Sequence, residues 1–164
     1  MKKLIILSIL ALGIMTESYA QKFGHANFEE IVSMLPERAT AEKEVQELQK
    51  KLEGRLQSMY QTYQSKLNEI QTDTTLTQTE SQSLGQEIQD LERRIQEFQQ
   101  TAMSEIEVKQ NDLMGKMFTK VRTAASEVGK ANEYTYIFDS STNGSLLYAG
   151  GEDITPLIKT QLGI

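Results

Sequence analysis

The clearest pattern in the chain is a pair of apolar stripes at helical spacing. In each stripe, apolar side chains recur at steps of three and four residues, which places them on one face of an α-helix. The first stripe runs through Val45, Leu48, Leu52, Leu56, Met59, Tyr63 and Leu67, and the second through Leu84, Ile88, Leu91, Ile95, Phe98, Ala102 and Ile106. No proline occurs between residues 39 and 131. Two long helices are therefore predicted in this region.

The two stripes are separated by "QTDTTLTQTE", residues 71–80. Threonine and aspartate side chains compete for backbone hydrogen bonds and interrupt helices. Thr77 and Glu80 have the spacing of a capping box that starts a new helix. If the chain folds back here, the stripes pair position by position about residue 75, from Leu67 with Leu84 to Val45 with Ile106. The pattern thus predicts an antiparallel helical hairpin over residues 39–131, with its turn near residues 72–76.

The flanking segments have a different character. Residues 22–28 and 134–138 are typical of short strands, and residues 139–145 contain the turn pair Asn143-Gly144, after which residues 146–149 ("LLYA") are expected to return as a further strand. Asp153 is expected to open a terminal helix with Pro156 in its first turn.

These flanks, residues 21–38 and 132–164, are expected to form a β-rich body at the root of the hairpin. A two-helix arm buries only one face of each helix, and three short strands leave unpaired edges, so closure by association of several copies is favoured. The predicted fold class is α+β, with a long hairpin arm on a small β body. The apolar side chains expected in that association body are Phe23, Phe28, Tyr136, Phe138 and Leu147.

Residues 1–20, "MKKLIILSILALGIMTESYA", have the pattern of a secretory signal sequence. Two lysines precede an apolar run, and the segment ends in Ser18-Tyr19-Ala20. Cleavage after Ala20 is expected, because the apolar run is shorter than the roughly 20 residues of a spanning helix. The alternative is an uncleaved membrane anchor.

Charge and composition narrow the possible functions. Residues 1–20 hold two of the 17 basic and one of the 23 acidic residues, so the remaining chain has a net charge of −7. This charge disfavours nucleic acid and anionic membranes as partners. The chain has no cysteine and one histidine, His25, which argues against a metal centre and a histidine-based catalytic triad. No cofactor is expected, and His25 is interpreted as structural.

The flanks carry a family resemblance. The segments "KFGHANFEEIVSMLPE", "YTYIFDSS" and "LLYAGGEDITPLIKTQL", on either side of a long helical hairpin, resemble the Skp/OmpH family of periplasmic chaperones. The resemblance implies a homotrimer in the periplasm, with three hairpins around a cavity. The implied partners are unfolded outer-membrane proteins, held without ATP. The basic arms of the best-known members have no counterpart here, so a lipopolysaccharide site does not carry over.

Three side chains are candidate contacts for a bound client: Tyr60, Leu76 and Met103. Two of them also have a plain structural interpretation, since Tyr60 can be simply an exposed tyrosine and Leu76 can close the hairpin against Ile70. Met114 and Phe118, near the root, are expected to pack on the body.

Two other functional classes remain open. The first is a structural coiled-coil scaffold or spacer of the cell envelope. The second is an enzyme built on carboxylates such as Asp139, Glu152 and Asp153, but these acids fit turns and a helix cap better. The chain is therefore not expected to be an enzyme.

Overall fold

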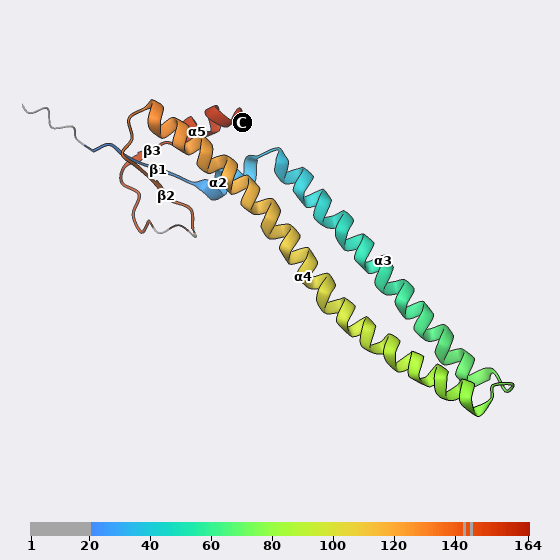
Figure 1. Ribbon diagram of the computed structural model, residues 1–164. Coiled ribbons are helices and arrows are strands. Elements are labelled where there is room, and N and C mark those ends of the chain that lie inside the picture. Colours follow the sequence, from blue (N-terminus) through green and yellow to red (C-terminus); the bar gives the residue numbers. More distant parts are fainter. Residues whose placement is uncertain (1–20, 143, 145) are drawn as a thin grey trace, which may run out of the picture.

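The computed structural model describes residues 21–164 apart from positions 143 and 145, so the expected signal sequence lies outside the described residues. A long arm of two antiparallel helices projects from a small body (Figure 1). The arm is formed by α3 (Glu37–Thr72) and most of α4 (Gln78–Ala131), and the last turns of α4 continue into the body. The predicted fold class, a long helical hairpin on a small sheet, is confirmed.

The tip of the arm is built from local side-chain bonds. The Thr77 hydroxyl accepts from the Glu80 amide at 3.3 Å, and the Glu80 carboxylate accepts from the Thr77 amide at 2.8 Å, which confirms the predicted capping box. At the end of α3, the Asp73 carboxylate accepts from the amide and hydroxyl of Thr75 at 2.8 and 2.6 Å. Hydrogen bonds from these threonine hydroxyls hold the pKa values of Asp73 and Glu80 below their usual range.

The two helices meet along the apolar stripes. None of the fourteen stripe side chains is exposed, and five are buried: Leu52, Leu84, Ile88, Leu91 and Ile95. The other nine are partly buried, namely Val45, Leu48, Leu56, Met59, Tyr63, Leu67, Phe98, Ala102 and Ile106. The seam is narrow, because a two-helix arm has no third element to cover its edges.

Polar contacts across the seam follow the same antiparallel order. Lys66 pairs with Glu87 at 2.5 Å near the tip, and Lys109 pairs with Glu44 at 2.7 Å near the root. Between them, the Arg55 guanidinium lies 4.9 Å from the centre of the Phe98 ring. Solvent-exposed ion pairs contribute little stability, about 0–1 kcal/mol each. They do fix which residues of α3 and α4 lie beside each other.

A short helix that the sequence analysis missed precedes the arm. This helix, α2 (Phe28–Met34), is capped by the Asn27 side chain, which accepts from the Glu30 amide at 3.0 Å. It buries Ile31 and Val32 in the body. Pro36 occupies the N-cap position of α3 without a side-chain hydrogen bond. The arm therefore begins at Glu37, two residues before the predicted boundary.

The sheet of the body has three parallel strands in the order β2-β1-β3. They are β1 (Phe23–Ala26), β2 (Tyr136–Asp139) and β3 (Glu152–Asp153). β1 packs closely against the body at Gly24, where a Cβ atom would lie 3.1 Å from the Tyr134 ring and 3.2 Å from Ile154. A larger residue at this position would require these two side chains to shift.

The prediction that residues 146–149 return as a strand is wrong. Leu146, Leu147, Tyr148 and Ala149 form no strand, and the third strand is β3, on the far side of β1. The chain after β2 therefore crosses the sheet as a loop. His25 holds both ends of this loop, since its Nε2 donates to the Gly151 carbonyl at 3.2 Å and its Nδ1 accepts from the Ser140 hydroxyl at 3.3 Å. This long-range contact has no signal in the local pattern.

Helices form most of the body, which also holds the small three-stranded sheet. Its core is formed around the end of α4, against β1, α2, the start of α3 and α5 (Thr155–Leu162). The buried members are Ala26, Ile31, Val32, Leu35, Ala41, Met117, Val121, Ala124, Ala125, Val128, Ile154 and Ile158. The strands of the sheet are only two to four residues long, so the sheet covers only a small part of this core.

The hairpin register can be tested with cysteines, because the chain has none of its own. Packed helices lie about 8–10 Å apart, so a short thiol crosslinker should join cysteines placed at Leu52 and Phe98 within one chain. Mass spectrometry of the denatured product distinguishes monomer from dimer. A matched pair at the exposed positions Gln57 and Arg94 serves as control and should react far less. Crosslinks found only between chains would contradict the hairpin.

A second prediction concerns the start of α5. The Asp153 carboxylate accepts from the Thr155 amide at 2.9 Å and from its hydroxyl at 2.6 Å. Asp153→Ala should lower the free energy of unfolding by about 1 kcal/mol, the usual net contribution of such a side-chain hydrogen bond.

The same bond makes stability depend on pH. The hydrogen bond from Thr155 lowers the pKa of Asp153 from 3.8, so its contribution is present above that pH and is lost as pH falls through the lower folded value. Urea unfolding of Asp153→Asn, which keeps an acceptor oxygen, should show a smaller loss without this acid dependence. Equal losses in both variants at every pH would argue against a stabilising role of the Asp153–Thr155 hydrogen bonds.

Candidate functional site

The open face of the sheet carries an aromatic cluster. Phe23 and Tyr136 are paired across β1 and β2, and their rings stack with centroids 5.8 Å apart. Phe138 lies 6.3 Å from Phe23 and 6.2 Å from Tyr136. Their exposed fractions are 46%, 56% and 41% for Phe23, Tyr136 and Phe138. An apolar face of this kind, beside unpaired strand edges, is typical of an association surface.

The loop that crosses the sheet adds two more exposed apolar side chains. Leu147 is fully exposed, and Tyr148 is 85% exposed. Phe28, the remaining residue assigned to the association body, is partly buried against the core. Three of the five residues proposed for association, Phe23, Tyr136 and Phe138, therefore form one cluster on the sheet.

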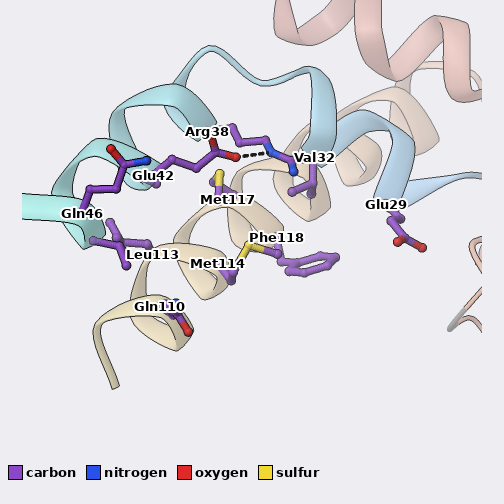
Figure 2. Close-up of a pocket in the computed structure, with 12 residues that line it drawn as sticks. Glu29, Val32, Arg38, Glu42, Gln46, Gln110, Leu113, Met114, Met117 and Phe118 are labelled. Carbon is purple, nitrogen blue, oxygen red and sulfur yellow. Dashed lines mark hydrogen bonds and ion pairs between the residues drawn. The ribbon is translucent and has the colours of Figure 1, made fainter. Parts of the chain in front are cut away.

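A groove opens at the root of the arm, where α2, α3 and α4 meet (Figure 2). Its volume is about 460 Å³. The lining residues are Glu29, Val32, Arg38, Ala41, Glu42, Val45, Gln46, Gln110, Leu113, Met114, Met117 and Phe118. Most of this lining is apolar.

The groove exists because the side chains of α3 become small toward the root. Ala41 and Val45 occupy positions where the stripe farther along the arm has leucines, so α3 leaves space beside α4. On α4, Met117 is buried beneath this space, while Met114 is 42% exposed and Phe118 is partly buried. In Figure 2, Met114 and Phe118 lie next to each other on the same side of α4.

The prediction for these two residues was thus partly wrong. Phe118 does pack against the core of the body, but Met114 stands at the groove instead of being covered. The groove is formed by three helices, one of which was not foreseen. The available signal was the Asn27–Glu30 spacing, which is that of a helix cap.

The groove has charged side chains toward one end of its rim and uncharged amides toward the other. The Arg38 guanidinium donates to Glu42 at 2.9 Å, so this cation and this carboxylate neutralise each other. Glu29 is exposed on α2 and takes part in no ion pair among the described residues. The amides of Gln46 and Gln110 lie at the opposite end of the lining (Figure 2).

The outer half of the arm is acidic. Between residues 58 and 89, all of which are described, Lys66 is the sole basic residue. Its ammonium group donates a hydrogen bond to the Glu87 carboxylate, and this bond raises the pKa of Lys66. No basic residue of this stretch is left to attract an acidic partner.

The three candidate client contacts are placed differently from one another. Tyr60 is 42% exposed, but its hydroxyl accepts from the Gln99 amide across the hairpin at 2.9 Å, so it stands beside the seam. Leu76 is partly buried in the turn. Met103 is 73% exposed on α4. The structure does not bring these three residues together.

Two of the acids considered for catalysis, Asp139 and Asp153, accept hydrogen bonds from backbone amides. The Asp139 carboxylate accepts from the Ser141 amide at 2.9 Å, and the Asp153 carboxylate accepts from the Thr155 amide at 2.9 Å. Within residues 21–164, positions 143 and 145 aside, no cluster of three or more His, Cys, Asp or Glu side chains could hold a metal ion. In that same part of the chain, none of the helices has the length and apolar character needed to cross a membrane.

Comparison with known proteins gives one clear result. The family model described as "Outer membrane protein (OmpH-like)" matches residues 22–162, which is nearly all of the described chain. No curated protein matches the sequence. The match spans both the body and the arm, and members of this family are periplasmic chaperones that act on outer-membrane proteins rather than enzymes. The chain belongs to the OmpH-like family.

Proposed function

We propose that the protein is an ATP-independent holding chaperone of the periplasm, exported by a signal sequence that is cleaved after Ala20. Three copies would associate through the body and enclose an unfolded outer-membrane protein between their arms. The observation that carries this proposal is the exposed aromatic face of the sheet, Phe23, Tyr136 and Phe138, at the root of a long polar arm. Association through this face would bury the cluster and leave the arms projecting together.

The dimensions of the arm fit this role. A helix of 36 residues, such as α3, spans roughly 54 Å at 1.5 Å per residue. Arms of this length, set around a common body, can surround an unfolded chain without offering a deep pocket. Each contact would be weak, but several arms acting on one client raise the effective concentration of every further contact.

The charge of the arm favours holding without electrostatic attraction. With Lys66 paired, the outer arm offers acidic carboxylates and many uncharged glutamine, serine and threonine side chains. Binding would therefore rest on enclosure, uncharged hydrogen bonds and scattered apolar contacts at residues such as Tyr60, Leu76 and Met103.

The function itself is tested by aggregation. An outer-membrane β-barrel diluted from urea scatters light as it aggregates, and the mature protein in molar excess should suppress this signal in the absence of nucleotide. An envelope scaffold or spacer would leave the aggregation unchanged, so this outcome would contradict the proposal.

The proposed association can be tested on the aromatic face. Phe138→Lys places a charge within the exposed cluster and should shift the protein from trimer toward monomer in sedimentation velocity experiments. Tyr60→Lys is a matched control, because Tyr60 has nearly the same exposure, 42% against 41%, but lies on the arm. A trimer that survives Phe138→Lys combined with Tyr136→Lys would exclude this face as the interface.

The proposed mode of binding predicts weak dependence on salt. The Debye length falls from about 10 Å at 0.1 M to about 3 Å at 1 M, which abolishes attraction between exposed charges. Affinity for a fluorescent unfolded outer-membrane protein should stay within about threefold over this range, because the outer arm has no unpaired basic residue. A loss of about tenfold or more would mean that charge attraction governs binding.

A further inference from the structure

We infer that the groove at the root of the arm binds a short extended segment of the unfolded client, with an apolar anchor and an adjacent lysine or arginine. The groove is the space between α2, α3 and α4 defined above (Figure 2). This inference rests on the proposed function, because the segment belongs to the held client. It adds one local site to a binding mode that otherwise depends on enclosure.

The groove has the size and character of a binding site. Its volume of about 460 Å³ falls within the range of roughly 300–1,000 Å³ that is typical of ligand pockets. Val45, Leu113 and Met114 offer apolar surface along it. Methionine side chains repack easily, so Met114 suits anchors of different shapes.

The walls of the groove are fixed before anything binds. Val32 from α2, Ala41 from α3 and Met117 from α4 are all part of the buried core of the body, with exposed fractions of 4%, 8% and 5%. Three helices are thus held in place around the space. A preformed site loses little conformational freedom on binding, which distinguishes this groove from the slender outer arm.

The rim indicates an extended peptide. A helix satisfies its own backbone, whereas an extended segment presents unpaired amides and carbonyls. Gln46 and Gln110 line one end of the groove, and each amide can both donate and accept a hydrogen bond. The strands of outer-membrane barrels alternate apolar and polar side chains, so such a segment presents a row of apolar anchors to one side.

The charges of the rim favour a basic residue beside the anchor. Arg38 is neutralised by Glu42 at 2.9 Å, which leaves Glu29 as the carboxylate of the lining without an ion pair among the described residues. In Figure 2, Glu29 lies on α2 beyond the Phe118 ring. A cation next to an anchor seated on Met114 and Phe118 would therefore meet Glu29.

The experiment uses the full mature protein and a defined probe. The probe is a fluorescein-labelled peptide of about ten residues, the length of one barrel strand segment, that alternates leucine and serine and ends in lysine. A second peptide ends in glutamate instead. Binding is followed by fluorescence polarisation, and a photoreactive side chain in the peptide allows the contacted residues to be mapped by mass spectrometry.

Two apolar side chains of α4, Met114 and Val108, provide a matched pair of variants. Met114→Glu places a charge in the groove and should weaken binding of the lysine peptide by about tenfold, the effect of losing one good apolar contact. Val108→Glu places the same charge at a position of the same helix that is 64% exposed, and should change the affinity by less than about twofold. Glu29→Lys should reverse the preference between the lysine and glutamate peptides. Crosslinks should fall on α2, α3 and α4 at the root.

Three outcomes would overturn the inference. The first is equal affinity of the Met114→Glu and Val108→Glu variants, or crosslinks that map to the outer arm. The second is a Met114→Glu variant that changes its oligomeric state, because the groove would then be covered by a second copy of the chain. The third is wild-type protein that suppresses aggregation but binds neither peptide, which contradicts the groove and leaves the proposed function intact. Wild-type protein that fails to suppress aggregation contradicts the function instead.

Discussion

Burial of one face of α4 between Met117 and Val128 holds the body together. This face contacts α2, the start of α3, the sheet and α5, so elements from both ends of the chain depend on it. Small residues in the middle, Ala124 and Ala125, let the neighbouring elements approach closely. Because α4 is a single helix of 54 residues, the element that forms the core of the body is also one half of the arm. The arm is therefore oriented by the same interaction that stabilises the fold.

The arm beyond this core has a different energetic character. Its seam buries five side chains and partly buries nine more, and most of the remaining surface of the arm is polar and exposed. Isolated helices are marginal in water, and most helical stability in proteins comes from packing of an apolar face. The arm thus has little stability of its own. Its structure is specified by the apolar stripes, by the hydrogen bonds of the tip and by a few ion pairs between the two helices, such as Lys66–Glu87. A slender, weakly packed arm is suited to adjusting around clients of different size.

The sequence predicted the arm well and the body poorly, for physical reasons. Helical stripes and the Thr77–Glu80 capping box are local signals, and the hairpin follows from their spacing alone. The parallel sheet is non-local, because β1 pairs with strands more than one hundred residues away. The prediction of a strand at residues 146–149 was wrong, because a local sequence pattern does not specify whether or where a segment joins a sheet. The groove depends on three helices at once, including the short α2, and on how the sizes of Ala41 and Val45 leave space, so no single stretch of sequence reveals it.

The two apolar surfaces of the body have different physical properties. The cluster of Phe23, Tyr136 and Phe138 is open and flat, lies beside unpaired strand edges, and carries no charge of its own, as expected for a surface that joins copies. The groove is concave, fixed by buried walls, and edged by Glu29 and amides, as expected for a surface that binds a short segment. Both lie within the body or at its junction with the arm, where the core holds their shape. Under the proposed function, specific contacts would be concentrated in this rigid part of the chain, and the long arm would enclose the part of a client that extends beyond the root.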